Sequence, residues 1–303
     1  MKKNRMMRIA SVLLIAVLMS TYAISGTFAK YVTTVTDGDS ARVAKWGITS
    51  TTLDKDAIFK AEYKNGEFIY VSDTDSNDEG EVADDVVAPG TSGTGTYALG
   101  GAPEVAYKIT FDLTDNSSTD VFLKQGVYAI GTWDNSTFKE ATGIDSYQLE
   151  NSDYYPIKWQ IQITTKNGTF TAVKAGTQKP NNNSPENKVV TYKDLNNLSE
   201  VDTALSATVI EFAPNANCDV ELTITWDWAF EKGDIASTNE SQKANNHIID
   251  DADTILGYLA TNSVAVKNSG NLQQPTDANY SLNVAYELNI TATQITATTN
   301  NNG

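Results

Sequence analysis

The residues that could support catalysis are few in this sequence. The chain has 303 residues but a single histidine, His247, and a single cysteine, Cys218. A zinc site of the H-E-x-x-H type needs two histidines, and a nucleophilic triad needs a histidine beside its nucleophile. No cation or histidine near Cys218 in the sequence would lower the pKa of its thiol, so we expect a buried thiol. The sequence therefore predicts that this protein is not an enzyme.

His247 has neighbours that are typical of a loop residue next to a helix start. Two asparagines precede it, and two isoleucines and two aspartates follow it. This composition favours a polar connection that leads into a short helix at 250–259. We therefore assign no catalytic role to His247.

An acidic segment at 73–84 contains the candidate metal ligands of the chain. Asp73, Asp75 and Asn77 provide oxygen atoms at the first, third and fifth positions of a calcium-binding loop. The sixth position, however, is an aspartate instead of the glycine that makes the sharp turn. The twelfth position is Asp84, which is shorter than the usual glutamate. A weak calcium site and a solvated acidic loop both remain open here, and we expect no other cofactor.

Residues 1–29 have the three parts of a secretory signal peptide. All of their charged residues are cations: Lys2, Lys3, Arg5 and Arg8. An apolar run of 11 residues follows at 9–19, which is too short for a membrane core that needs about 20 helical residues. Small residues permit cleavage after Ser25 or after Ala29. Retention as a membrane anchor is the alternative, because residues 22–24 lengthen the apolar run.

The charge of the chain is divided unevenly between this segment and the rest. Removing the four cations leaves 18 Lys and Arg against 38 Asp and Glu in residues 30–303, a formal net charge of −20. Phosphate backbones and anionic lipid would repel such a chain, so we expect no binding to nucleic acid and no membrane contact beyond the signal. A single cysteine also excludes an internal disulfide bond.

Alternation of apolar and polar residues is the dominant pattern after the signal, and it predicts β-strands. The clearest strands are expected at 105–113, 157–165, 220–228 and 280–290. Weaker candidates are 31–35, 67–72, 121–130, 169–173 and 208–212. The tryptophans at 159, 226 and 228 lie on the apolar face of their strands, which makes them core residues in preference to a sugar-stacking platform.

Many strands with few helices predict an all-β protein, specifically an antiparallel, jelly-roll-like β-sandwich. Residues 30–303 are expected to form a single domain, because no linker separates two complete sets of strands. Loop insertions are expected near 73–101, 174–187 and 237–261. Minor short helices are expected in or near them, at 194–205 and 250–259.

Several short segments carry a resemblance to a known family. They are Gly26–Tyr31 (GTFAKY), Asp39–Ala44 (DSARVA), Trp226–Trp228 (WDW), Asp253–Gly257 (DTILG) and Thr291–Gln294 (TATQ). Together they resemble the TasA/camelysin family of exported proteins of Gram-positive bacteria, and most closely its alternate-signal-mediated exported members. A dedicated SipW-type signal peptidase cuts the signals of this family. The resemblance thus implies cleavage between Ala29 and Lys30.

The resemblance also implies a function, that of a jelly-roll subunit in the extracellular fibres of a biofilm matrix. In such fibres the mature N-terminal segment adds as a strand to the next subunit. The corresponding donor strand here is Lys30, Tyr31, Val32, Thr33, Thr34, Val35 and Thr36. Its Thr, Val and Tyr residues have high β propensity, which supports strand addition on physical grounds. Pairing of 31–35 within its own domain is the alternative.

The expected partners and location follow from the same resemblance. They are further copies of the chain, the signal peptidase during export and sibling matrix proteins, at the cell surface or in the extracellular matrix. The metallopeptidase activity described for camelysin-like proteins is not expected, because one histidine cannot supply a zinc ligand set. The alternative function is a secreted monomeric binding module for carbohydrate or a host ligand, which would need exposed tryptophans.

Overall fold

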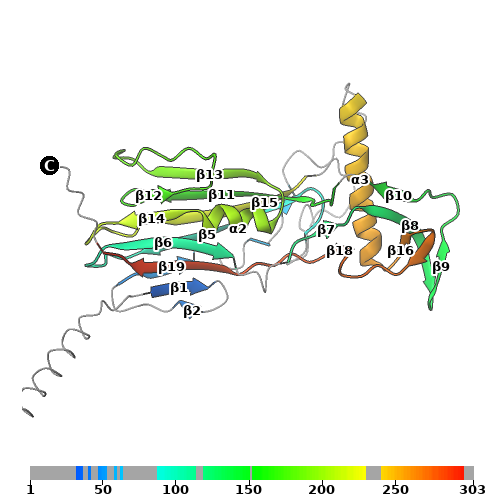
Figure 1. Cartoon of the computed structure of the whole chain (residues 1–303), viewed down its shortest axis with the longest axis horizontal. Helices are drawn as coiled ribbons and strands as arrows, with labels where there is room; N and C mark the ends of the chain where they lie inside the picture. Colours follow the sequence, from blue (N-terminus) through cyan, green and yellow to red (C-terminus); the bar gives the residue numbers. More distant parts are fainter. Residues whose placement is uncertain are drawn as a thin grey trace, which may run out of the picture.

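The structure is a computed structural model that describes residues 32–36, 40–41, 47–52, 58–59, 62–63, 87–113, 119–150, 152–229 and 240–296. Within these ranges the chain is an elongated, all-β molecule with two helices, α2 (Leu198–Ser206) and α3 (Glu240–Ala260). Figure 1 shows a two-layer sandwich at one end and a smaller lobe with α3 at the other. The predicted all-β, sandwich-like fold is confirmed.

The first layer, called sheet 1 here, contains six antiparallel strands. Their order is β12 (Thr169–Ala172), β14 (Val209–Phe212), β6 (Tyr107–Leu113), β19 (Leu288–Gln294), β1 (Val32–Thr36) and β2 (Ser40–Ala41). The first and the last strand along the described chain, β1 and β19, are therefore neighbours. Strands β12 and β2 form the two edges of the layer.

The second layer, sheet 2, is also antiparallel. Its order is β13 (Lys188–Leu195), β11 (Ile157–Thr165), β15 (Glu221–Trp228), β5 (Thr91–Gly100) and β3 (Thr49–Thr52), and β4 (Glu62–Tyr63) pairs with the same edge of β5 as an extra strand. In β11, Ile157, Trp159, Ile161 and Ile163 alternate with polar residues and are almost fully buried. This is the period-two pattern of a strand with one face in the core and one in solvent.

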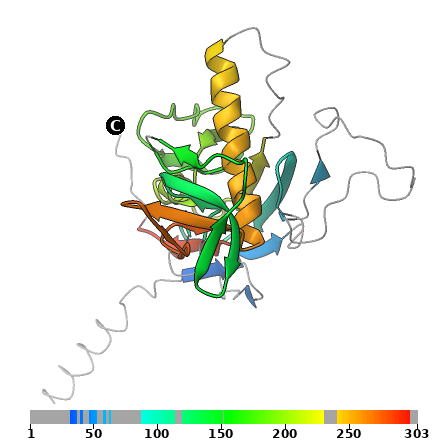
Figure 2. The ribbon, with the colours of Figure 1, turned by 90° about the vertical axis from the view of Figure 1, so that its right-hand side faces the viewer.

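The lobe at the far end is built on a sheet with the order β10 (Tyr147–Leu149), β8 (Gly126–Asp134), β16 (Val264–Asn268) and β17 (Asn271–Gln273), with β9 (Thr137–Glu140) paired to β8. Helix α3 lies across this end sheet (Figure 2) and buries Ala252, Ile255, Leu256 and Leu259. Between lobe and sandwich, β7 (Phe122–Leu123) pairs with β18 (Tyr280–Ser281). The buried residues of lobe and sandwich form one continuous core.

Most of the predicted strands are present, with shifted ends. The strands expected at 105–113, 157–165 and 220–228 correspond to β6, β11 and β15. The weaker candidates at 31–35, 169–173 and 208–212 correspond to β1, β12 and β14, and 121–130 contains β7 and most of β8. The insertion at 174–187 has neither helix nor strand, as predicted. The candidate at 67–72 lies outside the described residues.

Three expectations about element type are wrong. Residues 91–100, expected to be part of the 73–101 loop, form the central strand β5. The 237–261 insertion, expected as a loop with a short helix, contains the 21-residue helix α3. The segment 280–290 is not one strand, because β18 ends at Ser281 and β19 begins at Leu288. The helix expected at 194–205 begins later than predicted, at Leu198.

The break in 280–290 has a physical reason. The hydroxyl of Tyr286 lies 2.7 Å from that of Tyr97 on β5. The Tyr286 ring also packs edge-on against Trp159 of β11, with 6.2 Å between ring centroids. Residues 282–287 thus carry a sheet-2 contact before the chain enters sheet 1 at β19, so their alternation does not reflect a continuous strand.

Candidate functional site

The predicted donor segment lies at an edge of sheet 1. Its described part, β1, pairs antiparallel with β19 of the same chain, from Val32 opposite Thr293 to Thr36 opposite Asn289. On its other side, the neighbour of β1 among the described residues is the two-residue strand β2, which pairs at Val35 and Thr36. Among the described residues, β2 is thus the strand that separates part of β1 from the outside of the sheet.

The neighbour of β1 belongs to the core of the sandwich. On β19, Leu288, Ile290 and Ala292 are at most 2% exposed. The other side of β19 pairs with β6 along the whole of both strands. β19 is therefore a well-packed strand whose second backbone edge is covered by β1.

The opposite edge of sheet 1 is occupied by side chains. The backbone N–H of Phe170 on β12 donates to Oδ1 of Asn182 over 3.1 Å, and Nδ2 of Asn182 donates to the Phe170 carbonyl over 3.2 Å. The ammonium of Lys179 donates to the Thr171 carbonyl. Both Asn182 and Lys179 come from the 174–187 insertion. The two edges of sheet 1 are thus closed in different ways.

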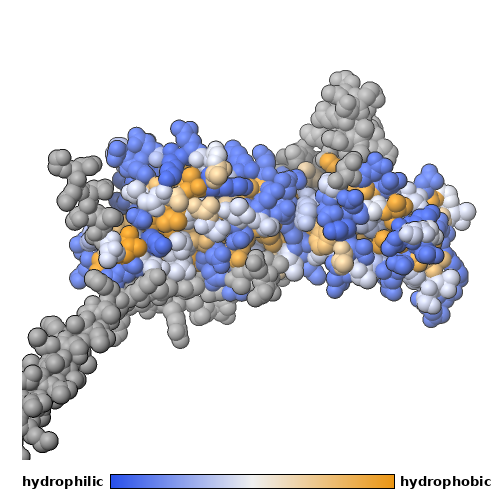
Figure 3. Space-filling view, in the orientation of Figure 1, coloured by the Kyte–Doolittle hydropathy of each residue, from blue (hydrophilic) through white to orange (hydrophobic). Residues whose placement is uncertain are grey.

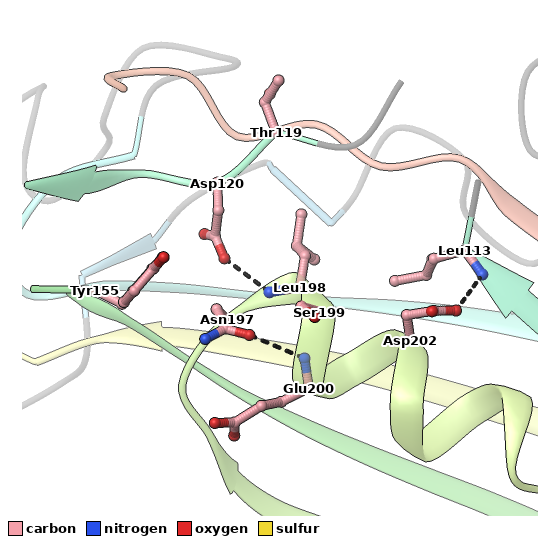
Figure 4. Close-up of a pocket in the computed structure, with 9 residues that line it drawn as sticks. All are labelled: Leu113, Thr119, Asp120, Tyr155, Asn197, Leu198, Ser199, Glu200 and Asp202. Carbon is pink, nitrogen blue, oxygen red and sulfur yellow. Dashed lines mark hydrogen bonds between the residues drawn. The ribbon is translucent and has the colours of Figure 1, made fainter. Parts of the chain in front are cut away.

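A pocket of about 480 Å³ lies at the start of α2 (Figure 4). Asn197 caps the helix, because its side-chain oxygen accepts from the Glu200 N–H over 2.9 Å. Asp120 accepts from the Leu198 N–H over 2.7 Å. On the next turn Asp202 accepts from the Leu113 N–H over 3.0 Å. These acidic groups hold the helix start against sheet 1 and the segment before β7.

Asp120 is the electrostatically unusual residue of this pocket. Burial raises the pKa of its carboxyl from 3.8 to about 6, against the lowering effect of the Leu198 and Val121 backbone N–H groups and of Lys158. Its second oxygen, Oδ1, is buried and has no hydrogen-bond partner. In the described part of the chain, no three His, Cys, Asp or Glu side chains are arranged to hold a metal ion. The pocket therefore has the chemistry of a helix anchor, with carboxylates that accept from backbone N–H groups.

The other residues singled out from the sequence lie apart from both places. Cys218 is buried at 3% exposure, and burial raises the pKa of its thiol to about 11, so it is a thiol at neutral pH. The three tryptophans, Trp159, Trp226 and Trp228, are at most 6% exposed. They are core residues, as predicted, and offer no sugar-stacking platform. His247 lies on α3.

Two predicted sites lie outside the described residues. These are the calcium candidate (Asp73, Asp75, Asn77 and Asp84) and the cleavage junction at Ala29 and Lys30, together with Lys30 and Tyr31 of the donor strand. None of the described helices is long and apolar enough to cross a membrane.

Sequence reasoning missed Asn182, Lys179 and a clasp between α3 and the sandwich. In the clasp, Oδ1 of Asp253 accepts from the Tyr154 hydroxyl over 2.8 Å and from the Trp228 indole N–H over 3.2 Å. Such contacts join residues far apart in the chain, and no local pattern marks them.

The comparison of the chain with protein-family models, curated proteins and solved structures finds no match.

Proposed function

We propose that this chain is an exported, non-enzymatic subunit of cell-surface or matrix fibres, and that it assembles by exchange of its N-terminal strand. In the monomer β1 covers β19 of its own chain. In the fibre the same segment, Lys30–Thr36, covers β19 of the next subunit. Export proceeds through a signal that a SipW-type peptidase cuts before Lys30, as in the TasA/camelysin-like proteins that the sequence resembles.

The observation that carries the proposal is the position of β1. It is a strand at the N-terminal end of the described chain, it is followed at the sheet edge by the two-residue strand β2, and it pairs in register with a core strand over five residues. Such an element can leave its own sheet by breaking, among the described pairings, those with β19 and β2. Exchange of an identical element between subunits replaces the lost hydrogen bonds one for one.

The surface of the described residues is consistent with assembly through backbone pairing. The face in Figure 3 is mostly hydrophilic, with hydrophobic side chains in small groups. Among the described residues, the exposed large hydrophobic side chains are Ile144 and Val189, at 48% and 41%. A broad apolar docking face is the usual mark of an interface made by side chains. Strand exchange needs none, because its main-chain hydrogen bonds supply the contact.

The direct test compares two forms of the protein by negative-stain electron microscopy. Residues 30–303 are expected to form filaments. Residues 41–303, which lack β1, are expected to stay monomeric, and an added peptide of residues 30–36 should bind them in a one-to-one ratio. Filaments from both forms, or from neither under matrix-like salt conditions, contradict the proposal.

A disulfide test distinguishes exchange from other ways of forming filaments. Thr34 and Thr291 are Cα partners across β1 and β19, a separation that suits a disulfide bond. The native Cys218 is buried and does not interfere. Filaments of the Thr34→Cys/Thr291→Cys variant, once oxidised, should run as a ladder of covalent multimers on a non-reducing gel.

The order of the two steps provides the control. When the same variant is oxidised as a monomer, β1 is locked in its own chain, and assembly should stop until a reductant is added. The single variant Thr291→Cys should assemble normally and give no ladder. If the oxidised filaments instead yield monomers with an intramolecular disulfide, β1 remains paired with β19 of its own chain. That result would contradict strand exchange.

A further inference from the structure

The edge of sheet 1 opposite to β1 has features that the proposed function does not require. β12 is a terminal strand, so one side of its backbone pairs with β14 and the other side faces out of the sheet. Exposed backbone groups of this kind accept strands from other molecules unless something covers them. In this chain the outer side of β12 is covered by side chains.

The side chain of Asn182 makes the hydrogen bonds to β12 that a neighbouring strand would make. In an antiparallel ladder, the N–H and C=O of one residue point to the same side and bond to the same partner residue. Phe170 presents both groups outward, and the amide of Asn182 accepts from the N–H at 3.1 Å and donates to the C=O at 3.2 Å. A single primary amide thus satisfies both backbone groups that an incoming strand would use.

Asn182 is held in place by its own loop. The Ser184 N–H donates to the Asn181 carbonyl and the Asn183 N–H donates to the Asn181 side chain, both over 3.1 Å, which forms a tight turn around Asn182. Phe170 is fixed in turn by a side chain that is 1% exposed. The Asn182 amide and the backbone of Phe170 that it covers are therefore both held in position within the monomer.

Lys179 covers the carbonyl of the next residue, Thr171, where the pairing of β12 with β14 is interrupted by a register shift between Phe170 and Ala172. Its ammonium donates to that carbonyl. A strand that approached this edge would have to displace the ammonium and the Asn182 amide at the same time. A lysine ammonium held against a sheet edge hinders edge-to-edge pairing, because its charge must be desolvated before a strand can bind there.

We propose that Asn182 and Lys179 close the β12 edge of sheet 1 against strand addition by a second copy of this chain. The site is a latent strand-acceptor edge, and its chemistry fits an extended segment of another subunit. The proposal rests on the proposed function in one respect, since closing this edge leaves the β1 edge as the acceptor of sheet 1 and makes growth linear. The closure itself is a property of the folded monomer.

The test uses residues 30–303 of the Thr34→Cys/Thr291→Cys variant, oxidised as a monomer, in which β1 stays on β19 and cannot exchange. The variant Asn182→Ala/Lys179→Met removes the covering amide and ammonium. Two opened β12 edges can pair antiparallel across a two-fold axis, so the mean mass by light scattering is expected to rise about twofold towards a dimer. Amide exchange at Phe170 should be faster than in the parent when both are monomeric at high dilution.

A matched control removes the same chemical groups from exposed positions nearby. Asn183→Ala/Lys166→Met deletes one amide and one cation, so it has the same net charge as the test variant. It should keep the mass and the Phe170 exchange rate of the parent. Thermal melts of both variants check that each is folded. The variant Asn182→Asp keeps an acceptor for the Phe170 N–H but loses the donor, and should lie between the parent and Asn182→Ala in exchange rate.

The results separate the two proposals. Faster Phe170 exchange without any rise in mass shows that the edge opens and still accepts no strand, which overturns the inference. Unchanged Phe170 exchange shows that Asn182 does not cover the edge, which also overturns it. A dimer of the test variant, together with 30–303 protein that lacks the disulfide and forms no filaments, supports the closed edge and rejects the fibre. If both proposals hold, Asn182→Ala/Lys179→Met in the 30–303 protein without the disulfide should give branched or bundled filaments.

Discussion

Gly93 and Gly95 lie on the inward face of β5, where the segment with Ile58 contacts the sheet. A Cβ on Gly93 would lie 2.0 Å from the Ile58 carbonyl oxygen and 2.5 Å from Nε1 of Trp226. The Trp226 indole N–H donates to that same carbonyl. The missing side chain at position 93 therefore provides the space in which a core tryptophan and a backbone carbonyl meet.

The variant Gly93→Ala should lose about 1–3 kcal/mol of unfolding free energy, because the new methyl group overlaps backbone and an indole ring that cannot move freely. Equilibrium urea denaturation measures the loss. The control is Gly257→Ala on α3, where no atom beyond the adjacent helix backbone lies within 4 Å of the added Cβ. That variant should gain about 0.5–1 kcal/mol, since alanine is the better helix former. Equal effects of the two substitutions would contradict the packing at Gly93.

The raised pKa of Asp120 leads to a prediction about how stability depends on pH. Its folded pKa of about 6 lies above the unfolded value of 3.8. Between these values the folded state holds a proton that the unfolded state has lost, so the contribution of Asp120 to stability falls as pH rises from about 4 to 6 and is constant above about 7. The total change is at most about 3 kcal/mol, from two pKa units at about 1.4 kcal/mol each.

The variant Asp120→Asn isolates this contribution from those of the other acidic residues. The difference in unfolding free energy between variant and parent should shift in favour of the variant by up to about 3 kcal/mol from pH 4 to pH 7. Urea denaturation at each pH measures it, on dilute protein. A difference that stays constant with pH would show that the carboxyl has an ordinary pKa in the folded protein.

At the scale of elements, β5 shows why a central strand escaped prediction. Its inward positions are Thr91, Gly93, Gly95, Tyr97 and Leu99, so the two glycines interrupt the apolar side of the alternation. The outward positions are small or polar residues, and the segment has the composition of a loop. The glycines are required by the contact with Ile58 and Trp226, which brings together three distant parts of the chain. No window of the sequence contains that information.

Helix α3 was underestimated for a related reason. Its C-terminal half, predicted as a helix at 250–259, has apolar residues at helical spacing. The preceding residues are rich in Asn and Ser, which favour loops in isolation. Ala252, Ile255, Leu256 and Leu259 pack on the end sheet, and a helix nucleated by such contacts extends at little further cost. The longer helix is thus a tertiary effect.

The clasp of Asp253 joins α3 to the sandwich, and its removal has a predictable cost. Asp253→Ala leaves the Tyr154 hydroxyl and the Trp228 indole N–H without the carboxylate oxygen that accepts from both. We expect a loss of about 2 kcal/mol in unfolding free energy, because both hydrogen bonds have a charged acceptor. In the variant, amide exchange along α3 should also become faster relative to amide exchange in β11 and β15. Thr254→Ala, at the exposed neighbouring position, should change either quantity little. Similar losses in the two variants would show that the clasp does not hold the helix.

At the scale of the whole molecule, alternation was enough to predict the layers and the buried tryptophans. It also predicted a strand at 31–35, which corresponds to β1. What it could not supply was the pairing of strands. That β1 lies beside β19 and that Asn182 covers β12 depend on contacts across more than 250 residues in the first case and between a loop and a strand in the second. Hydrogen bonds of this kind are set by the finished fold, and local propensity does not encode them.

The net charge of −20 for residues 30–303 makes the last prediction, which concerns assembly. In the proposed fibre, subunits with this charge repel each other, and each must approach closely before β1 can exchange. Added salt shortens the screening length from about 30 Å at 0.01 M to about 8 Å at 0.15 M. Filament growth of the 30–303 protein should therefore be faster at 0.15 M than at 0.01 M NaCl, and faster at mildly acidic than at alkaline pH when salt is low. Light scattering follows the growth, with the 41–303 protein as the control that should not grow in either condition. Growth that slows as salt is added would mean that attraction between charges drives assembly, in conflict with the repulsion argued from the sequence.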